Sequence, residues 1–377
     1  MADPYQQLAS YLDSLPAGYP PTDSGVELCI LRKLFSPQEA NLALHLTLIP
    51  EQAHVVAYRA RQPLDLTAAK LEEMELKGLI SASQPQDGGV KKYAISQFVV
   101  GFYEDQVNRL DREVAVLMEE YAPYFFENGP WKKLPQIRTI PVHESIPITS
   151  EVMPYEQAET ILRSKTAFAV RNCICRQERQ LLEQGCDKPM EVCMSFDGAA
   201  LNTAASGKGR LINLEEALDI LEQARRVGMV LQPANSKDPI FLCACCSCCC
   251  GILRNIKNQP RPSDLVANAF TAHHDPGLCS ACGACLAQCP MDALVETDDG
   301  TIVHLPERCI GCGLCVGVCP SEALTMLRKP AQELPSIPRS TTETYIRLGL
   351  RRNPWSIFQM AGLAAKSCRD RLLAPRK

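Results

Sequence analysis

Two stretches of twelve residues share one cysteine pattern and decide the fold of the region around them. They read CSACGACLAQCP at 279–290 and CIGCGLCVGVCP at 309–320, thirty residues apart. Each contains three cysteines separated by two residues, then a fourth cysteine after three more residues, followed directly by proline. A zinc ribbon needs two Cys-x2-Cys knuckles rather than two runs of four cysteines. The pattern therefore favours iron–sulfur chemistry over zinc.

The spacing within each run has a chemical reason. Three cysteines on a tight loop can reach three irons of one [4Fe-4S] cube, whereas the fourth starts a helix that points away and ligates the other cube. Two runs of this kind therefore predict two [4Fe-4S] clusters. Because eight cysteines supply four ligands for each cube, His273, His274 and His304 are not needed as ligands.

Residues 272–328 resemble the bacterial two-cluster ferredoxin domain, a pseudo-twofold fold that holds two [4Fe-4S] clusters. The resemblance implies two ligand sets, which are Cys279, Cys282, Cys285 and Cys319 for one cluster and Cys309, Cys312, Cys315 and Cys289 for the other. It also implies one-electron transfer.

The ferredoxin-like segment is strongly acidic. Two arginines, Arg308 and Arg328, stand against seven acids and leave a formal charge of −5; the acids are Asp275, Asp292, Glu296, Asp298, Asp299, Glu307 and Glu322. A concentrated acidic face steers a basic partner and repels nucleic acid. We therefore expect redox partner proteins with a basic docking face.

Ten further cysteines lie upstream in an unusual arrangement. They are Cys173, Cys175, Cys186, Cys193, Cys243, Cys245, Cys246, Cys248, Cys249 and Cys250. Six of them fall within eight residues, and because neighbouring side chains point in different directions, these six cannot all face one cube.

Three interpretations of these ten cysteines stay open at this point. The first is one or two additional clusters, with Cys173, Cys175, Cys186 and Cys193 as one set. The second is an unusual cluster or a site with a spare thiolate, where a disulfide or a small ligand is reduced. The third is a core of inert thiols, which six cysteines in eight residues make hazardous under oxidation.

The N-terminal region reads as helices followed by a hairpin. Ser36-Pro37-Gln38-Glu39 is a helix start with a capping box, which predicts a helix through Leu48. A second helix is predicted from Asp65 to Gly78, then paired strands at 79–80 and 92–95. This order resembles the winged helix-turn-helix domains over about residues 20–97. The helix at 67–80 has a net charge of −1, which favours protein docking over DNA binding.

A stripe of apolar and aromatic side chains predicts one long helix over 98–121. Its members follow at steps of three and four and are Tyr103, Val107, Leu110, Val114, Leu117 and Tyr121. Either the stripe packs on the core of its own chain or it forms a homodimer interface.

The fold class expected from these segments is α+β with several domains. The predicted parts are a winged-helix-like domain at 1–121, a proline-rich linker at 122–160, a cysteine-rich domain at 161–271, the two-cluster ferredoxin-like domain at 272–328 and a tail at 329–377. The tail is expected to contain a helix over 342–366 that is broken at Pro354.

Composition excludes several classes of protein. The 377 residues include 20 cysteines and 46% hydrophobic residues at a net charge of −4, which is typical of a globular chain. The first basic residue is Arg32, so a secretory signal is not expected, and the longest nearly apolar stretch, 240–253, is shorter than the ~18 residues of a membrane span. These features predict a reduced, cytoplasmic protein whose thiols bind metal.

Over its whole length the chain resembles a loosely defined group of multidomain 4Fe-4S binding proteins of anaerobes. The resemblance implies iron–sulfur electron transfer, as an electron-transfer protein or oxidoreductase subunit rather than a stand-alone enzyme. Two alternatives are a redox-sensing regulator that uses the winged helix and a reductase with its active site at Cys243–Cys250. No residues are predicted to be catalytic.

Overall fold

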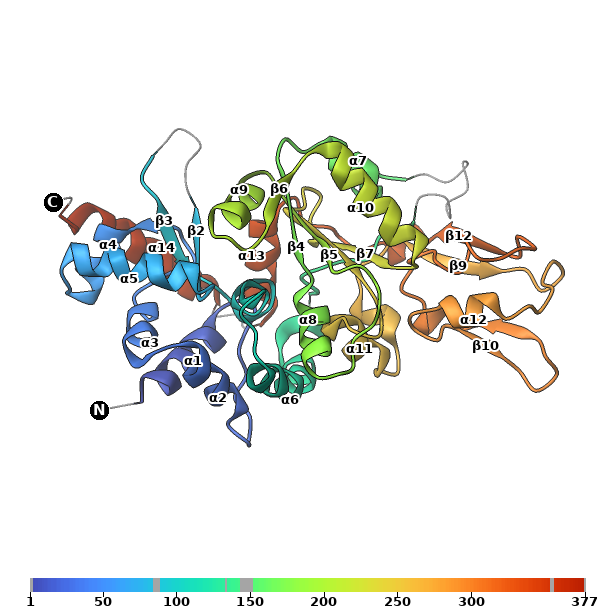
Figure 1. Cartoon of the computed structure of the whole chain (residues 1–377), viewed down its shortest axis with the longest axis horizontal. Coiled ribbons are helices and arrows are strands. Elements are labelled where there is room, and N and C mark those ends of the chain that lie inside the picture. Colours follow the sequence, from blue (N-terminus) through green and yellow to red (C-terminus); the bar gives the residue numbers. More distant parts are fainter. Residues whose placement is uncertain (1–2, 84–88, 133, 143–151, 353–355, 376–377) are drawn as a thin grey trace. The chain divides into compact units, whose positions relative to one another are not determined.

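The computed structural model describes residues 3–83, 89–132, 134–142, 152–352 and 356–375 (Figure 1). It is a mixed structure of helices and sheets that divides into two compact units. Unit 1 comprises residues 1–134, 202–209 and 345–377, and unit 2 comprises 135–201 and 210–344. The predicted cysteine-rich and ferredoxin-like segments both fall in unit 2.

Unit 1 contains most of the helices and one small sheet. Its elements are α1 (Pro4–Ser14), α2 (Val26–Leu34), α3 (Pro37–Ala43), β1 (Glu51–Gln52), α4 (Ala53–Ala60), α5 (Leu64–Leu76), β2 (Ile80–Ser83), β3 (Lys92–Ile95), α6 (Arg112–Asn128) and α14 (Ser356–Leu373). Two helices belong to both units, α9 (Asp197–Ala205) and α13 (Thr341–Arg352). The sheet is antiparallel in the order β1-β3-β2.

The predicted start of α3 and the predicted glycine after α5 are confirmed, whereas the predicted end of the first helix is wrong. Ser36 and Glu39 form the capping box of α3, which ends at Ala43 rather than Leu48. Helix α5 is followed by Gly78 in the left-handed conformation, and β2 pairs with β3 from Ile80 opposite Ile95. Most of the predicted hairpin turn, 84–88, lies outside the described residues.

The continuous helix predicted over 98–121 is wrong. Val100 adopts a left-handed conformation, Asn108 does so again, and Asp111 caps a new helix by accepting a hydrogen bond from the Val114 amide. Helix α6 then runs through Pro123 to Asn128, beyond the predicted boundary at 121. Because these breaks interrupt the helix, the stripe offers no continuous helix for a dimer seam. Tyr121, its last member, is buried within unit 1, where its ring contacts Tyr19.

Unit 2 holds the larger sheet and two hairpin-like pairs of strands. Its elements are α7 (Ala158–Arg163), β4 (Phe168–Asn172), α8 (Ile174–Leu181), β5 (Glu191–Phe196), β6 (Arg210–Ile212), α10 (Leu214–Arg226), β7 (Val230–Pro233), β8 (Phe241–Cys245), α11 (Gly251–Lys257), β9 (Phe270–His274), α12 (Ala284–Gln288), β10 (Leu294–Glu296), β11 (Ile302–His304) and β12 (Leu324–Arg328).

The larger sheet is antiparallel in the order β6-β4-β5-β8-β7. Helix α10 packs on β4 and β5 and also contacts α7 (Figure 1). Part of the predicted linker is built into unit 2 rather than lying outside it. Ile137 and Ile140 are buried and form isolated β-bridges with Ala234 and Leu231.

The ferredoxin-like segment repeats its backbone conformation every thirty residues. Strand β9 pairs with β12, and β10 pairs with β11. Left-handed residues recur in pairs thirty positions apart, which are Ala281 and Gly311, Gly283 and Gly313, and Asp292 and Glu322. The internal repeat of the sequence is therefore also a repeat of structure.

Within unit 1, the C-terminal helix α14 is attached through a buried ionic network. Arg59 of α4 binds Asp370 of α14 at 2.8 Å and Glu51 at 3.0 Å, and Ser367 donates a hydrogen bond to Glu51 at 2.6 Å. The acid side chains are almost fully buried. Among the described residues, no helix has the length and apolar character needed to cross a membrane.

Candidate metal centres

Two cavities in the ferredoxin-like segment are each lined by four cysteines. The outer cavity is lined by Cys279, Cys282, Cys285 and Cys319. The inner cavity is lined by Cys289, Cys309, Cys312 and Cys315. Each cavity therefore combines three cysteines of one run with the fourth cysteine of the other, as in the two predicted ligand sets.

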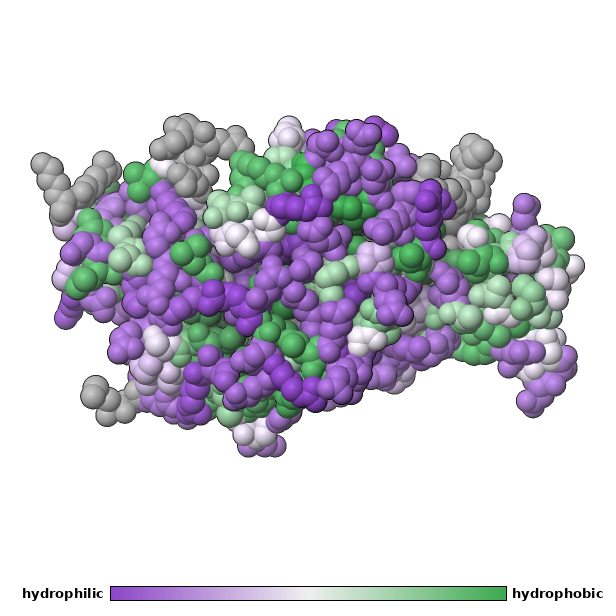
Figure 2. Space-filling model, viewed as in Figure 1, coloured by the Kyte–Doolittle hydropathy of each residue, from purple (hydrophilic) through white to green (hydrophobic). Residues whose placement is uncertain are grey.

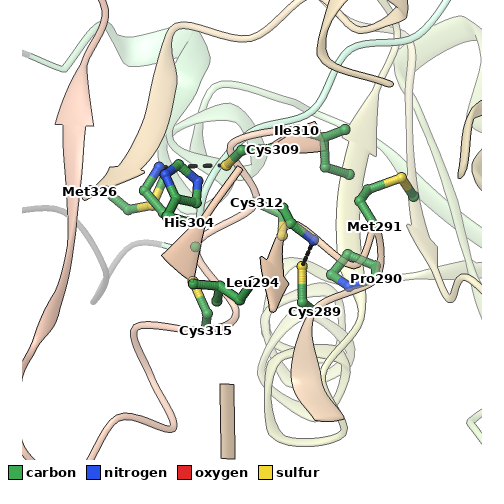
Figure 3. Close-up of a pocket in the computed structure, with 13 residues that line it drawn as sticks. Cys289, Pro290, Met291, Leu294, His304, Cys309, Ile310, Cys312, Cys315 and Met326 are labelled. Atoms are coloured by element: carbon green, nitrogen blue, oxygen red, sulfur yellow. Dashed lines mark hydrogen bonds between the residues drawn. The ribbon is translucent and has the colours of Figure 1, made fainter. Parts of the chain in front are cut away.

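The two cavities differ in their exposure. Figure 3 shows the labelled cysteines of the inner cavity around one space, together with Leu294, His304 and Met326. Cys309, Cys312 and Cys315 are buried, whereas Cys282 of the outer cavity is exposed. Cys285 of the outer cavity and Cys315 of the inner cavity belong to one buried core. A group held in the outer cavity is thus nearer to solvent.

Main-chain N–H groups donate hydrogen bonds to several of these sulfurs. The amide of Ala293 lies 3.2 Å from Cys289 Sγ, and that of Ala281 lies 3.4 Å from Cys279 Sγ. At Cys319, burial opposes ionisation, but hydrogen bonds from the Ser321 hydroxyl and nearby amides lower the pKa of the thiol. Donors of this kind stabilise thiolates and the metal groups bound to them.

His304 is a functional residue that the sequence reasoning missed. Its side chain lines the inner cavity together with Cys309 (Figure 3). Burial raises the pKa of the Cys309 thiol, but His304 and the amides of Ala272 and Gly311 outweigh it and lower the pKa to about 7. The matching residue thirty positions earlier, His274, lines the outer cavity. Only this repeat of a histidine at corresponding positions signals the pair in the sequence.

The chain passes so close to itself beside the inner cavity that Gly311 cannot be replaced without strain. A Cβ at Gly311 would lie 2.4 Å from the carbonyl oxygen of Phe270, and the residue has φ of +70°. Its counterpart Ala281 adopts the same left-handed conformation with a side chain. The close approach to Phe270, added to the left-handed conformation, therefore requires glycine at 311.

Six of the upstream cysteines form a closed ring of thiols in unit 2. Each hydrogen-bonds to the next in the order Cys173, Cys175, Cys250, Cys245, Cys243 and Cys193, and Cys193 returns to Cys173. Within this six-thiol ring, contacts with both neighbours lower the pKa values of Cys243 and Cys250. Thiols with a lowered pKa supply the thiolates that bind metal.

Strand pairing and helix starts place the six-thiol ring. Cys243 and Cys245 lie two residues apart on β8 and so share one face of the sheet. Cys193 of β5 pairs directly with Cys243. Cys173 and Cys250 stand immediately before α8 and α11. The sequence places these residues up to seventy-seven positions apart, so their grouping depends on the sheet.

The other four upstream cysteines form a separate four-thiol group. The Sγ atoms of Cys186, Cys246, Cys248 and Cys249 all lie within 4.8 Å of one another. Cys186 Sγ is 3.5 Å from Cys249 Sγ and 3.8 Å from Cys246 Sγ. The predicted set of Cys173, Cys175, Cys186 and Cys193 is therefore wrong, because Cys186 lies beyond the end of α8 and joins the turn after β8 instead.

A buried arginine accompanies the four-thiol group. Arg176 of α8 is fully buried, and its Nη2 donates to Cys246 Sγ at 3.3 Å while its Nη1 donates to the carbonyl oxygen of Pro189. Arg176 also hydrogen-bonds to Cys186. Burial opposes its charge, but Cys173, Cys246 and Cys186 together raise its pKa.

Helix α11 connects the six-thiol ring to the inner cavity. It begins directly after Cys250 and ends at Lys257, whose carbonyl oxygen accepts a hydrogen bond from Arg308 at 3.0 Å. Arg308 also donates to the carbonyl oxygen of Met291 at 2.8 Å, and Met291 lines the inner cavity. Seven helical residues span ~10 Å, so the ring and the inner cavity lie near opposite ends of one short helix.

Comparison with protein families agrees with the sulfur-lined cavities. The family model of the 4Fe-4S dicluster domain matches residues 271–325. This region is a ferredoxin-type iron–sulfur domain that holds at least one [4Fe-4S] cluster, and it supports a role in electron transfer. No curated protein and no solved structure matches the chain.

Proposed function

We propose that the protein relays single electrons through two [4Fe-4S] clusters and a third iron–sulfur centre in the six-thiol ring. One cluster would be held in the outer cavity and one in the inner cavity, each by the four cysteines that line it. In bound form such clusters accept and donate one electron at a time. The chain's own part is to position the sulfurs, exclude water and set the potentials.

The observation that carries the proposal is the exchange of the fourth cysteine between the two runs. Cys319 lines the cavity of the first run, and Cys289 lines the cavity of the second run. This crossing suits two cubes and is not needed by two independent zinc knuckles. It also places both cavities in one hydrophobic core, where Cys285, Cys309 and Cys315 pack together.

The proposed path has a direction set by burial. The outer cavity, with its exposed Cys282, would exchange electrons with a partner. The inner cavity lies deeper and is followed by helix α11 and the six-thiol ring. We place the ring at the far end of the relay, because α11 begins after Cys250 of the ring and Arg308 joins its last residue, Lys257, to Met291 of the inner cavity.

We propose that the redox partner is a protein with a basic docking face. The turn between β10 and β11 exposes Glu296, Asp298 and Asp299. Figure 2 shows hydrophilic surface over the end of this hairpin and hydrophobic surface beside it. Leu278 is 56% exposed next to Cys279 and supplies apolar contact area near the outer cavity. An apolar centre with a charged rim is typical of transient interfaces.

We propose that α5 and the three-stranded sheet β1-β3-β2 belong to a winged-helix-like module that docks to a protein rather than binding DNA. The lysines of α5 support this interpretation because both bind carboxylates. Lys70 lies 2.5 Å from Glu73, and Lys77 lies 2.7 Å from Glu39. We place the protein in the cytoplasm of an anaerobe, where exposed clusters survive.

The test is iron and sulfide analysis of anaerobically purified protein together with electron paramagnetic resonance of the reduced state. Two cubes account for about eight irons and eight sulfides, and the ring centre adds more of both. The variant Cys245→Ala is expected to lose only the added iron and sulfide, with Cys29→Ala as a control that loses none. Colourless wild-type protein would overturn the proposal. About eight irons per chain in both the wild type and Cys245→Ala would show that the six-thiol ring holds no iron–sulfur centre.

A further inference from the structure

We propose that the four-thiol group of Cys186, Cys246, Cys248 and Cys249 binds one tetrahedral metal ion, zinc or iron, and no cluster. This inference does not depend on electron transfer. It assigns a different kind of centre to four cysteines that the sequence pattern leaves without a role.

The distances between the sulfurs favour a single ion. Four thiolates at ~2.3 Å from one ion lie ~3.8 Å apart in a regular tetrahedron. In the four-thiol group, two of these distances are 3.5 and 3.8 Å, and all of them are within 4.8 Å. Thiolates of a cubane bind different irons and point outward from its corners, so they stand further apart than thiolates on one ion. The group is too tight for a cube.

The proposed cluster sites provide an internal comparison. Across the described parts of the chain, the four-thiol group is the one set of three or more possible ligands with this mutual closeness. No three cysteines of the outer or the inner cavity, all of which are described, have their sulfur atoms within 4.8 Å of one another. The same structure therefore distinguishes wide sulfur sets, suited to cubes, from one narrow set.

The charge around the group matches an anionic tetrathiolate. Four thiolates around a divalent ion carry a net charge of −2. Arg176 is fully buried, and its Nη2 donates a hydrogen bond to Cys246 Sγ at 3.3 Å. A buried guanidinium requires an anionic partner, and this group supplies one. Arg176 would thus orient the metal ligand Cys246 through its hydrogen bond.

The ion would join two segments that are sixty residues or more apart. Cys186 belongs to the loop after α8, and the other three ligands belong to the turn at 246–249, where the Cys250 amide donates to the Cys246 carbonyl oxygen at 3.0 Å. The turn is flanked by Cys245 and Cys250, which are members of the six-thiol ring. Metal in the four-thiol group would therefore fix the side chains of the ring as well.

The test compares total metal with inorganic sulfide. Iron–sulfur cubes contain equal iron and sulfide, whereas a mononuclear ion brings no sulfide. Anaerobically purified full-length protein is expected to show an excess of zinc plus iron over sulfide of about one per chain. The variant Cys249→Ser is expected to lose this excess, and Cys368→Ser, at an exposed cysteine of unit 1, is expected to keep it.

X-ray absorption spectroscopy of the wild-type protein tests the metal site even if the Cys249→Ser variant fails to fold. If zinc is the excess metal, its edge is expected to show four sulfur neighbours and no nearby metal. If iron is the excess metal, the oxidised protein is expected to show a high-spin ferric signal that Cys249→Ser lacks. Equal metal and sulfide, or a Cys186–Cys249 disulfide in metal-free protein, would overturn the inference while leaving the ferredoxin signals to test the proposed function separately.

Discussion

Cys186 and Cys249 are sixty-three residues apart in the sequence, yet their Sγ atoms lie 3.5 Å apart. The contact belongs to one of two separate groups into which the ten upstream cysteines divide. Neighbouring residues of the run at 243–250 serve two sets, since Cys249 belongs to the four-thiol group and Cys250 belongs to the six-thiol ring. A change in one set is therefore expected to leave the other set assembled unless the turn itself unfolds.

Replacing Arg176 by glutamine is expected to weaken metal binding at the four-thiol group by about 10–100-fold. The change removes the charge that offsets the thiolates and keeps a polar side chain of similar length. Competition with a chelator of known affinity measures the effect. The control is Arg226→Gln at an exposed arginine that pairs with Glu222. Equal metal retention by both variants would contradict a role of Arg176 in holding the ligands.

Replacing His304 by leucine is expected to lower the potential of the inner-cavity cluster. The imidazole lines the inner cavity with Cys309 and lowers the pKa of its thiol, so it also favours the reduced, more negative state of a cluster held there. A loss of about 1 kcal/mol corresponds to about 40 mV for one electron. Redox titration followed by electron paramagnetic resonance measures the shift. His273→Leu, at an exposed residue of β9, is expected to change neither potential. An unchanged potential of the inner-cavity cluster in His304→Leu would show that His304 does not influence the cluster in the protein that contains it.

Replacing Gly311 by alanine is expected to destabilise the ferredoxin-like segment by about 2–4 kcal/mol. The new Cβ would lie 2.4 Å from the Phe270 carbonyl oxygen, and that backbone belongs to β9. Loss of visible cluster absorbance on heating under argon measures the effect. Gly283→Ala has the same left-handed conformation without a close contact, since its nearest atom is 3.9 Å away. It is expected to cost only about 1 kcal/mol, and similar losses in both variants would show that the steric contact is unimportant.

Replacing Arg59 by leucine is expected to destabilise unit 1 by about 3–5 kcal/mol, because it leaves two buried carboxylates without a partner. Arg32→Leu breaks the exposed pair with Asp3 and is expected to cost less than about 1 kcal/mol. Urea unfolding followed by circular dichroism compares the two. Equal midpoints would show that the network does not hold α14 in place.

The contribution of Asp370 to this network should depend on pH. Burial opposes its ionisation, but Arg59 and Arg369 lower its pKa below the ordinary value. Its contribution is therefore present above the unfolded pKa of about 3.9 and is lost as the pH falls below it. The difference in stability between wild type and Asp370→Asn is expected to shrink on acidification from pH 7 to pH 3.

Duplex DNA is expected not to bind in the oxidised, reduced or apo state. Besides the lysine pairs of α5, Lys91 before β3 binds Glu72 at 2.7 Å and Glu75 at 3.2 Å, which leaves few cations for phosphates. Fluorescence anisotropy of a labelled duplex at low salt tests this. The double variant Glu72→Lys, Glu73→Lys is expected to gain weak, salt-dependent binding. Binding by the wild type that changes with cluster state would instead support the redox-sensing regulator.

Local signals predicted much of the chain. Ser36 and Glu39 mark the start of α3, and Gly78 marks the end of α5; the cap and the left-handed glycine are both present in the structure. The helix predicted over 98–121 failed because the spacing of apolar residues continued across a break. Asp111, an ordinary N-cap residue, was the local sign of that break, and the periodicity concealed it.

The sequence by itself determined the ferredoxin-like segment, because its ligands repeat at fixed short spacings and each tight loop defines its own geometry. Only the tertiary structure decided how the ten upstream cysteines divide. Cys193 meets Cys243 through a pairing of strands, whereas Cys186 meets Cys249 through a loop and a turn. Contacts of this kind depend on the register of a sheet and the direction of a turn, which spacing along the chain does not encode.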